Sequence, residues 1–343
     1  MKKLLNTLYI LSENAYLSLK NENAVVYMED GSHRDIPLLS LESIFSFSYK
    51  GASPALIGEC ANRGISISFF SPEGRFLAMP TGRTKGNVLL RKKQNRVSDS
   101  EEESALIARN FIFGKVYNSK WLLERTVRDH GLRVDSEKIK LKSKYLTEGY
   151  KQVLSMTDLE SIRGLEGQAA TNYFEVFNDL ILNQKEDFEF KTRSRRPPLD
   201  RVNALLSFGY RVLANDCVSA LEGVGLDPYV GFLHRDRPGR EPLAFDLMEE
   251  FRCVMVDRFI LTLINQRQIN AKHFAEKENG AVLLNDDGRK VFFGQWQMRK
   301  KEELTHPYLK EKVCWGQIPY IQALLLSRYL RGDLDGYPVF LWK

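Results

Sequence analysis

The sequence is poor in cysteine and contains no C-x-x-C pair. Its four cysteines, Cys60, Cys217, Cys253 and Cys314, each stand alone among apolar neighbours. A zinc site needs clustered thiolate or imidazole ligands, and a disulfide-stapled fold needs an oxidising compartment. We therefore expect four free thiols in a reducing compartment.

Long hydrophobic runs are also missing. No 18 consecutive residues are apolar, so no membrane-spanning helix is expected. The first five residues imitate a secretory signal, but polar residues interrupt the apolar run at 6–7 and 12–14, and no small-residue cleavage site follows. We predict a cytoplasmic protein with no membrane partner.

The charge balance is not extreme. Fifty Lys and Arg face 44 Asp and Glu, which gives a formal net charge of +6, and 43% of the residues are hydrophobic. Such a composition is typical of a globular protein, and its mild basic excess permits a nucleic-acid partner without requiring one. The motifs of nucleotide-binding loops, zinc proteases and serine hydrolases are all lacking.

The 343 residues divide into two stretches of different pattern. Residues 1–85 contain short strand-like runs between turn residues, with one short helix at 54–63, and 80–86 has the composition of a linker. Residues 86–343 are mainly helical in pattern. The expected fold is α+β and multidomain: a small N-terminal β-sandwich-like domain (1–85), then a larger, mainly α-helical catalytic domain (86–343).

Capping residues and apolar periodicity locate the main helices of the second domain. We expect them at 88–97, from 101 to about 129, and at 165–183, 201–221, 243–268 and 319–331. An Asp-Gly pair at 287–288 lies between two apolar runs, which predicts a small β-hairpin inserted there.

Three segments place charged or imidazole groups among apolar residues. Segment 163–170 contains Glu166, segment 231–235 contains His234, and segment 245–252 contains three acids. Buried charges are costly unless they are paired or bind a metal. Carboxylates together with one histidine therefore make a site for a hard divalent cation the natural hypothesis.

Each segment also has an ordinary explanation. Glu166 could serve only the dipole of a helix start, and His234 could be a structural histidine. Asp246, Glu249 and Glu250 share one helix face, where they could form a solvated acidic patch or be neutralised by nearby arginines. Residue chemistry alone does not choose between Glu249 and Glu250.

Arginines cluster in two loops near these segments. Residues 191–198 form a basic, proline-containing run, and three arginines follow His234 within six residues. A charge run is usually a solvated surface, but beside a cation site it suits contacts with a nucleic-acid backbone.

Taken in order, these segments resemble the CRISPR adaptation integrases, the "Cas one" family. The resemblance lies in Arg-Gly-Leu-Glu-Gly-x-Ala-Ala at 163–170, Arg-Pro-Pro-x-Asp-x-Val-Asn-Ala-Leu-Leu-Ser-Phe-Gly-Tyr at 196–210 and Gly-Phe-Leu-His at 231–234. It continues in Asp-Leu-Met-Glu at 246–249 and in Gln-Ala-x-x-Leu-x-Arg-x-Leu-Arg-Gly at 322–332. It spans the whole chain, and the closing pattern is similar to the type I, subtype C branch.

The resemblance implies a metal-dependent integrase and endonuclease. By the family pattern, Glu166, His234 and Glu249 are the metal ligands and Asp246 is an additional catalytic acid, with Mg²⁺ or Mn²⁺ as the expected ion. The implied reaction is attack by the 3′-hydroxyl of a foreign DNA fragment on a phosphodiester at a CRISPR repeat. With water as the nucleophile, the same site cleaves DNA.

The resemblance also implies partners. These are double-stranded DNA (spacer precursor and repeat), a second copy of the chain joined through the N-terminal domain, and the small second adaptation protein. From charge and position, the expected DNA contacts are Arg163, Arg193, Arg195, Arg196, Arg235 and Arg237. The alternatives are a non-catalytic DNA-binding scaffold and a general structure-specific nuclease.

Overall fold

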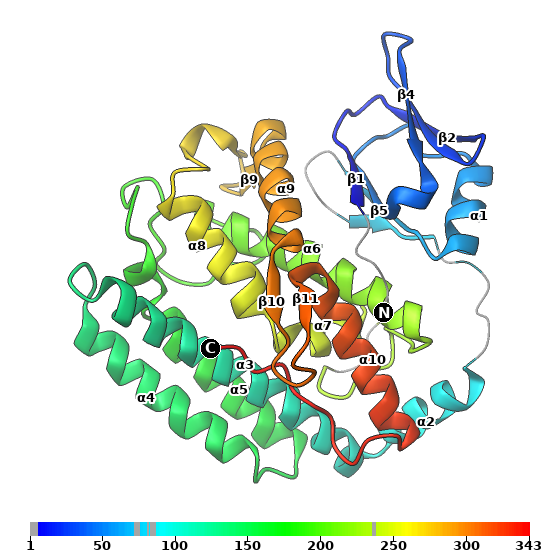
Figure 1. Cartoon of the computed structure of the whole chain (residues 1–343). Coiled ribbons are helices and arrows are strands. Elements are labelled where there is room, and N and C mark those ends of the chain that lie inside the picture. Colours follow the sequence, from blue (N-terminus) through cyan, green and yellow to red (C-terminus); the bar gives the residue numbers. More distant parts are fainter. Residues whose placement is uncertain (1–5, 72–75, 81, 83–86, 235–237) are drawn as a thin grey trace. The chain divides into compact units, whose positions relative to one another are not determined.

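A computed structural model describes residues 6–71, 76–80, 82, 87–234 and 238–343 (Figure 1). The chain forms two compact units. The first comprises Met1–Lys85 and Lys272–Glu302, and the second comprises Gly86–Ala271 and Glu303–Lys343. The expected combination of a small N-terminal β region and a larger helical part is confirmed. The division differs from the expected one because Lys272–Glu302 groups with the N-terminal residues.

The N-terminal part of the first unit contains two small sheets. Strands β2 (Tyr16–Lys20), β3 (Asn23–Tyr27) and β4 (His33–Pro37) form an antiparallel meander. The other sheet has the order β1-β5-β6-β7, and its strands are β1 (Asn6–Ile10), β5 (Leu41–Ser46), β6 (Ser66–Phe70) and β7 (Phe76–Ala78). Because β1, β5 and β6 are parallel, a crossover is required, and α1 (Pro54–Arg63) provides it between β5 and β6.

Alternation along these strands produces the core of the first unit. Leu17, Ile44 and Leu56 are fully buried in one cluster that joins both sheets to α1. Ser53 caps the start of α1 by accepting a hydrogen bond from Leu56 N, and Gly64 ends the helix with φ of 70°, as its sequence predicts.

The β-hairpin expected around Asp287-Gly288 is not formed there, and an antiparallel pair lies just before it in the sequence. The antiparallel pair is formed by β8 (Phe274–Glu276) and β9 (Val282–Leu284), and residues 286–301 are helical (α9, Asp286–Lys301). The physical reason is capping: the Asn285 side chain accepts a hydrogen bond from Gly288 N, so the Asn-Asp-Asp-Gly run starts a helix instead of turning a hairpin. Phe293 of α9 stacks on Tyr9 of β1 with ring centroids 4.1 Å apart.

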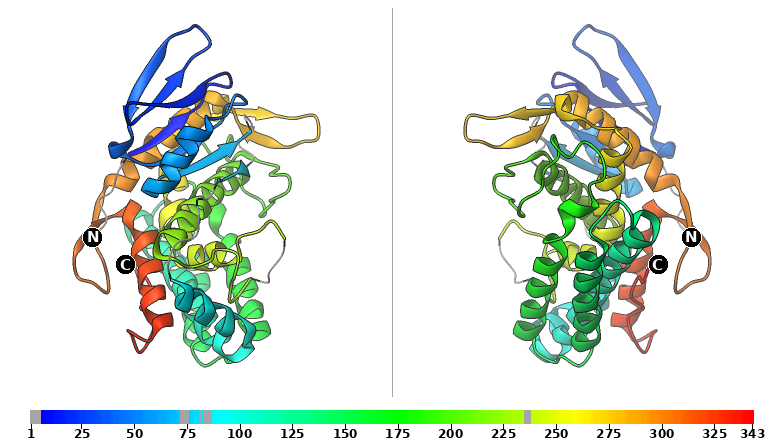
Figure 2. Two further views of the ribbon diagram at one scale, coloured as in Figure 1. Left: turned by 90° about the vertical axis from the view of Figure 1, so that its right-hand side faces the viewer. Right: turned by 90° about the vertical axis from the view of Figure 1, so that its left-hand side faces the viewer.

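Three helices form one layer of the second unit. After α2 (Val88–Asp99), they are α3 (Glu101–His130), α4 (Ser136–Val153) and α5 (Leu159–Phe174), which lie side by side in Figures 1 and 2. Side chains cap the starts of all three, from Ser100, Asp135 and Asp158 respectively. The capping residues therefore fix where these helices begin, including α5, which carries Arg163 and Glu166.

A buried helix, α6 (Arg201–Val224), packs against α7 (Pro242–Glu249) and α10 (Ile318–Arg331). The single helix expected at 243–268 is interrupted: α7 ends at Glu249, a π-helical turn spans Cys253–Asp257, and α8 covers Arg258–Asn265. A π turn inserts one residue, which changes the direction of the side chains that follow and often marks a functional site.

The C-terminal residues complete the second unit. A two-stranded ribbon, β10 (Glu303–Thr305) with β11 (Lys312–Cys314), leads into α10, and the chain then crosses α3. There, Asn118 binds the carbonyl of Phe340 and the N–H of Trp342. No helix in the described part of the chain is both long enough and apolar enough to cross a membrane.

Candidate active site

The three acids of α7 and its end are buried, not solvated. Asp246 and Glu250 are 0% exposed and Glu249 is 5% exposed, which excludes the solvated acidic patch. Their partners separate them. Asp246 binds the 232–234 loop, Glu249 binds two basic side chains, and Glu250 binds the C-terminal segment. The three neighbouring acids therefore bind three different parts of the protein.

Glu249 is held by two cations. Arg252 Nη1 lies 2.9 and 3.1 Å from the two carboxylate oxygens, and Lys115 Nζ lies 2.8 Å from Oε2. Burial alone would raise the pKa of Glu249, but Arg252, Lys115 and His234 more than offset it and hold the pKa well below its usual range. Glu249 is therefore an anion at neutral pH.

Lys115 joins Glu249 to Glu166. Its ammonium also pairs with Glu166 Oε1, so α3, α5 and the end of α7 each contribute one group to this cluster. The Lys115 side chain is 9% exposed, whereas the Glu166 side chain is 30% exposed. Two of the three predicted ligands therefore share one buried cation and retain access to solvent on the Glu166 side.

His234 is oriented by Asp246. Asp246 Oδ2 accepts hydrogen bonds from the N–H groups of Phe232 and Leu233, and Oδ1 accepts one from the His234 N–H at 3.0 Å. The same Oδ1 lies 2.6 Å from His234 Nδ1. Because an ionised carboxylate only accepts hydrogen bonds, Nδ1 carries the proton and Nε2 keeps its lone pair for a ligand.

The pKa of His234 reflects the same contacts. Burial alone would lower the pKa, but the hydrogen bond that His234 donates to Asp246, the charge of Asp246 and the charge of Glu249 raise it above the usual value. Lys115 acts in the opposite direction. These mutual effects show that His234, Glu249 and Lys115 act on one another electrostatically.

Gly231 lets the histidine loop approach α7. A Cβ at this position would lie 2.7 Å from Pro242 Cβ and 3.2 Å from Asp246 Oδ2. Arg163 fixes the other end of the loop by donating to the Leu233 carbonyl from Nε and Nη2, at 3.0 and 2.6 Å. Glycine at 231 is thus a requirement of close packing.

The donor set fits a hard divalent cation. Carboxylate oxygens and one imidazole nitrogen suit Mg²⁺ or Mn²⁺, and the Lys115 ammonium already stands as a cation between Glu166 and Glu249. Within the described residues, no three His, Cys, Asp or Glu side chains are close enough together to form a metal-binding group as they stand. The three-ligand set therefore stays a prediction.

The predicted DNA-binding arginines fall into three groups. Arg163 and Arg193 have internal partners: Arg193 donates to Asn203 Oδ1 at 2.6 Å and to Ser207 Oγ at 3.1 Å. Arg195 and Arg196 are exposed. Arg235 and Arg237 lie outside the described residues.

A further buried acid, Asp257, lies next to the site. It accepts hydrogen bonds from the hydroxyls of Tyr210 and Tyr173, the latter at 3.0 Å. Burial raises the pKa of Asp257 to about 6, although Arg252 and the two tyrosines oppose that shift. Arg252 also lies over the Tyr210 ring, 4.1 Å from its centroid, so this cluster supports the arginine that binds Glu249.

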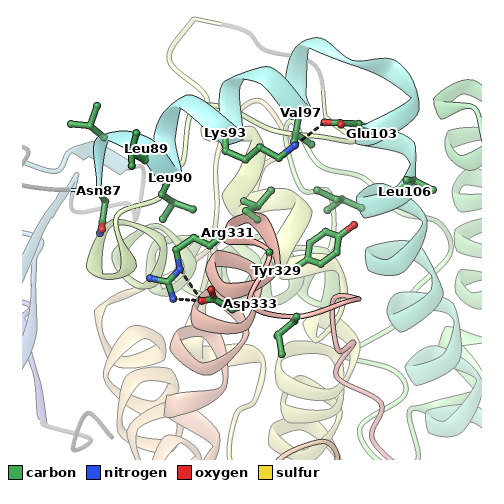
Figure 3. Close-up of a pocket in the computed structure, with 15 residues that line it drawn as sticks. Asn87, Leu89, Leu90, Lys93, Val97, Glu103, Leu106, Tyr329, Arg331 and Asp333 are labelled. Atoms are coloured by element: carbon green, nitrogen blue, oxygen red, sulfur yellow. Dashed lines mark hydrogen bonds and ion pairs between the residues drawn. The ribbon is translucent and has the colours of Figure 1, made fainter.

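A groove of about 980 Å³ lies elsewhere in the second unit and contains none of the predicted site residues. It is lined by α2, α3 and the end of α10, as Figure 3 shows, and ion pairs Lys93–Glu103 and Arg331–Asp333 flank its apolar walls. The candidate site is thus defined by its charged groups and not by the groove.

Lys115 is the site residue that the sequence interpretation missed. It lies between Gly114 and Val116 in a stretch of α3 where Phe111 and Ile112 are fully buried. A lysine on the buried face of a helix needs a charged partner, and that pattern could have identified it.

The chain is similar to known proteins over its whole length. Residues 8–298 match the family described as CRISPR associated protein Cas1. The chain is 46% identical over 343 residues to a CRISPR-associated endonuclease Cas1 from Chlorobaculum tepidum, and the match covers 100% of both chains. It is 47% identical over 348 residues to one from Rhodospirillum rubrum, again with 100% of both covered.

Solved structures share the fold. A Cas1 protein from Thermotoga maritima superposes with a TM-score of 0.81 at 25% identity, covering 97% of this chain and 99% of that one. A casposase bound to an integration product gives a TM-score of 0.84 at 21% identity, covering 99% of this chain and 95% of that one, which shows the fold alone.

A small β region followed by a larger helical part is the architecture that this chain shares with the Cas1 protein from Thermotoga maritima. This chain belongs to the CRISPR-associated Cas1 family.

Proposed function

We propose that this protein is a metal-dependent DNA endonuclease and integrase that inserts foreign DNA fragments at a CRISPR repeat. The observation that carries the proposal is the partly buried cluster in which Glu166 and Glu249 share one cation and Asp246 orients His234. Curated relatives at 46% and 47% identity are named CRISPR-associated endonucleases. The subtype C assignment remains part of the proposal.

In the mechanism, each residue has a defined task. Glu166, Glu249 and Nε2 of His234 would hold Mg²⁺ or Mn²⁺, which, when bound, supplies charge stabilisation at the phosphate under attack. Asp246 keeps the proton on Nδ1 of His234, and Arg252 keeps Glu249 ionised and in place. The attacking group is the 3′-hydroxyl of the incoming fragment, or water when the strand is cut.

We further propose that Arg195 and Arg196 contact the DNA backbone, since both are exposed, and that Arg235 and Arg237, which follow His234 in the sequence, do so as well. Arg163 and Arg193, given their internal partners, act mainly by holding the loops around the site. The basic charge of the chain, +6, is consistent with such a partner.

Assembly is also a proposal. We infer a homodimer formed through residues 1–85 and a complex with the small second adaptation protein. A solved structure at 22% identity is a Cas6-RT-Cas1–Cas2 complex, and that assembly is a property of that protein. Size-exclusion chromatography with light scattering, with and without the second protein, measures both expectations.

The test is a joining assay with a DNA fragment and a plasmid that carries a repeat. Glu166→Ala and His234→Ala should bind DNA like the unchanged protein but lose joining, and EDTA should abolish joining by the unchanged protein. Normal joining by either variant contradicts the proposal and favours a DNA-binding scaffold. Joining or cutting that ignores the repeat favours a general structure-specific nuclease.

A further inference from the structure

Lys115 lies where a divalent cation is expected. Its Nζ is 2.8 Å from Glu249 Oε2 and also pairs with Glu166 Oε1, so it bridges two carboxylates from different helices. Residue Lys115 is 7% exposed and Glu249 is 5% exposed, so the contact between these two is made in a largely dry environment. There an unpaired charge is costly, and each acid depends on a nearby cation.

The two basic residues at Glu249 have different geometries. Arg252 places Nη1 against both oxygens of Glu249, at 2.9 and 3.1 Å, and its guanidinium also lies over the Tyr210 ring. Lys115 instead stands between Glu249 and Glu166. A guanidinium is held rigidly by such paired and stacked contacts, whereas an ammonium on a flexible four-carbon chain can leave its place.

We propose that Lys115 is a positioning residue whose ammonium holds Glu166 and Glu249 together in the metal-free protein and is displaced when the metal binds. This inference rests on the proposed metal site. An ammonium and a divalent cation repel each other at shared carboxylate oxygens, so the two compete for the same place. Lys115 thus keeps the ligands assembled and at the same time limits the affinity for metal.

Lys115→Met tests the competition, because methionine has a similar length and no charge. Calorimetric titration of the metal-free protein with Mn²⁺ should give a dissociation constant about tenfold lower than that of the unchanged protein, equivalent to roughly 1.4 kcal/mol. Lys120→Met is the matched control. Lys120 lies on the same helix and pairs with Glu124 at 3.8 Å, so its loss removes an equal charge without touching the site.

A second measurement needs no variant. In amine-specific labelling followed by mass spectrometry, Lys115 of the unchanged protein should be protected without metal and should label several-fold faster with saturating Mn²⁺. Lys120 should label at the same rate in both conditions. If Lys115→Met does not fold, this labelling measurement by itself tests whether Mn²⁺ displaces Lys115.

The outcomes separate the inference from the proposed function. If Mn²⁺ binds the unchanged protein and His234→Ala weakens it, the metal site stands. If Lys115→Met then binds Mn²⁺ no more tightly than the unchanged protein, or if Lys115 labelling does not respond to Mn²⁺, the inference about Lys115 is wrong and the proposed function stands. If Mn²⁺ binds neither the unchanged protein nor Lys115→Met, the proposed function and the inference both fail.

Discussion

Glu249 and Glu250 are adjacent, and their environments assign them opposite roles. Glu249 meets Lys115 and Arg252, whereas Glu250 accepts hydrogen bonds from Gln322, Tyr337 and the Phe340 N–H. Burial raises the pKa of Glu250 to about 8, although the three donors oppose that shift. A cation site needs an ionised ligand, and the environment of Glu249 favours that form.

The paired variants Glu249→Gln and Glu250→Gln test this assignment. We expect Glu249→Gln to lower DNA joining by at least about 100-fold, since a lost ligand removes several kcal/mol of charge stabilisation. Glu250→Gln should keep joining within a few-fold, because its side chain faces the C-terminal segment. Equal losses in single-turnover assays of the two variants would contradict the assignment.

Asp257 predicts a measurable pH dependence of stability. Its pKa is raised from 3.8 to about 6, so the folded state favours the neutral acid and its contribution is lost as pH rises through that interval. The loss is on the order of 1–3 kcal/mol. Asp257→Asn mimics the neutral form, so its stability relative to the unchanged protein should rise between pH 4 and about pH 7. Chemical denaturation at several pH values checks this, and a constant difference would refute it.

At the residue scale, sequence alone located the acids but not their partners. Glu166, His234, Asp246 and Glu249 were found as charges among apolar residues, and the family resemblance selected Glu249 over Glu250. The contact of Lys115 with two carboxylates joins positions 51 residues apart and more, which no local pattern encodes. The positive charge of Arg163 and Arg193 likewise does not predict that both side chains donate hydrogen bonds inside the protein.

At the scale of elements, the 231–234 loop and α7 form one unit. Asp246 collects three backbone N–H groups of the loop, and the absence of a side chain at Gly231 allows this approach. The loop geometry therefore decides where the imidazole stands.

Gly231→Ala should disturb this unit. Its Cβ would lie 2.7 Å from Pro242 Cβ, so the loop must shift, at a cost of about 1–3 kcal/mol of unfolding free energy. We expect joining to fall with it, because His234 moves. Gly294→Ala is the control: nothing lies within 4 Å of its Cβ position in α9, and it should be neutral or slightly stabilising. Equal stability and activity in Gly231→Ala would show that the loop is not so constrained.

Capping residues made several helix ends predictable, whereas the helix expected at 165–183 begins at Leu159 and ends at Phe174, and two other differences have physical causes. Ser53, Ser100 and Gly64 mark helix ends as their chemistry requires. The sequence at 285–288 is compatible with a hairpin turn or with a helix start. The hydrogen bond from Gly288 N–H to the Asn285 side chain stabilises the helix start. The π turn at Cys253–Asp257 leaves the apolar pattern intact, so periodicity predicted one unbroken helix there.

At the scale of the whole molecule, the C-terminal segment closes the helical unit. Phe340 is fully buried, and its backbone is tied to Glu250 and to Asn118. Gly114 permits the contact, since a Cβ there would lie 2.6 Å from Val339 Cγ1. The end of the chain thus lies directly behind the helix that carries Glu249.

Removal of residues 337–343 should therefore destabilise the protein strongly. Loss of Phe340 alone costs about 3–5 kcal/mol, and Glu250 loses two of its donors. Tyr337→Phe, which removes one hydroxyl, should cost only about 1 kcal/mol. Thermal unfolding of both variants measures the difference. A truncated protein with an unchanged melting temperature would contradict this role of the segment.

We propose that His234, Glu166 and Glu249 bind one divalent cation. Pulsed electron paramagnetic resonance of bound Mn²⁺ tests it most directly, because it detects the coupling of an imidazole nitrogen to the metal. We predict a nitrogen signal from one histidine in the unchanged protein and its loss in His234→Gln. Mn²⁺ bound without a nitrogen signal, or with the same signal in His234→Gln, would contradict the account.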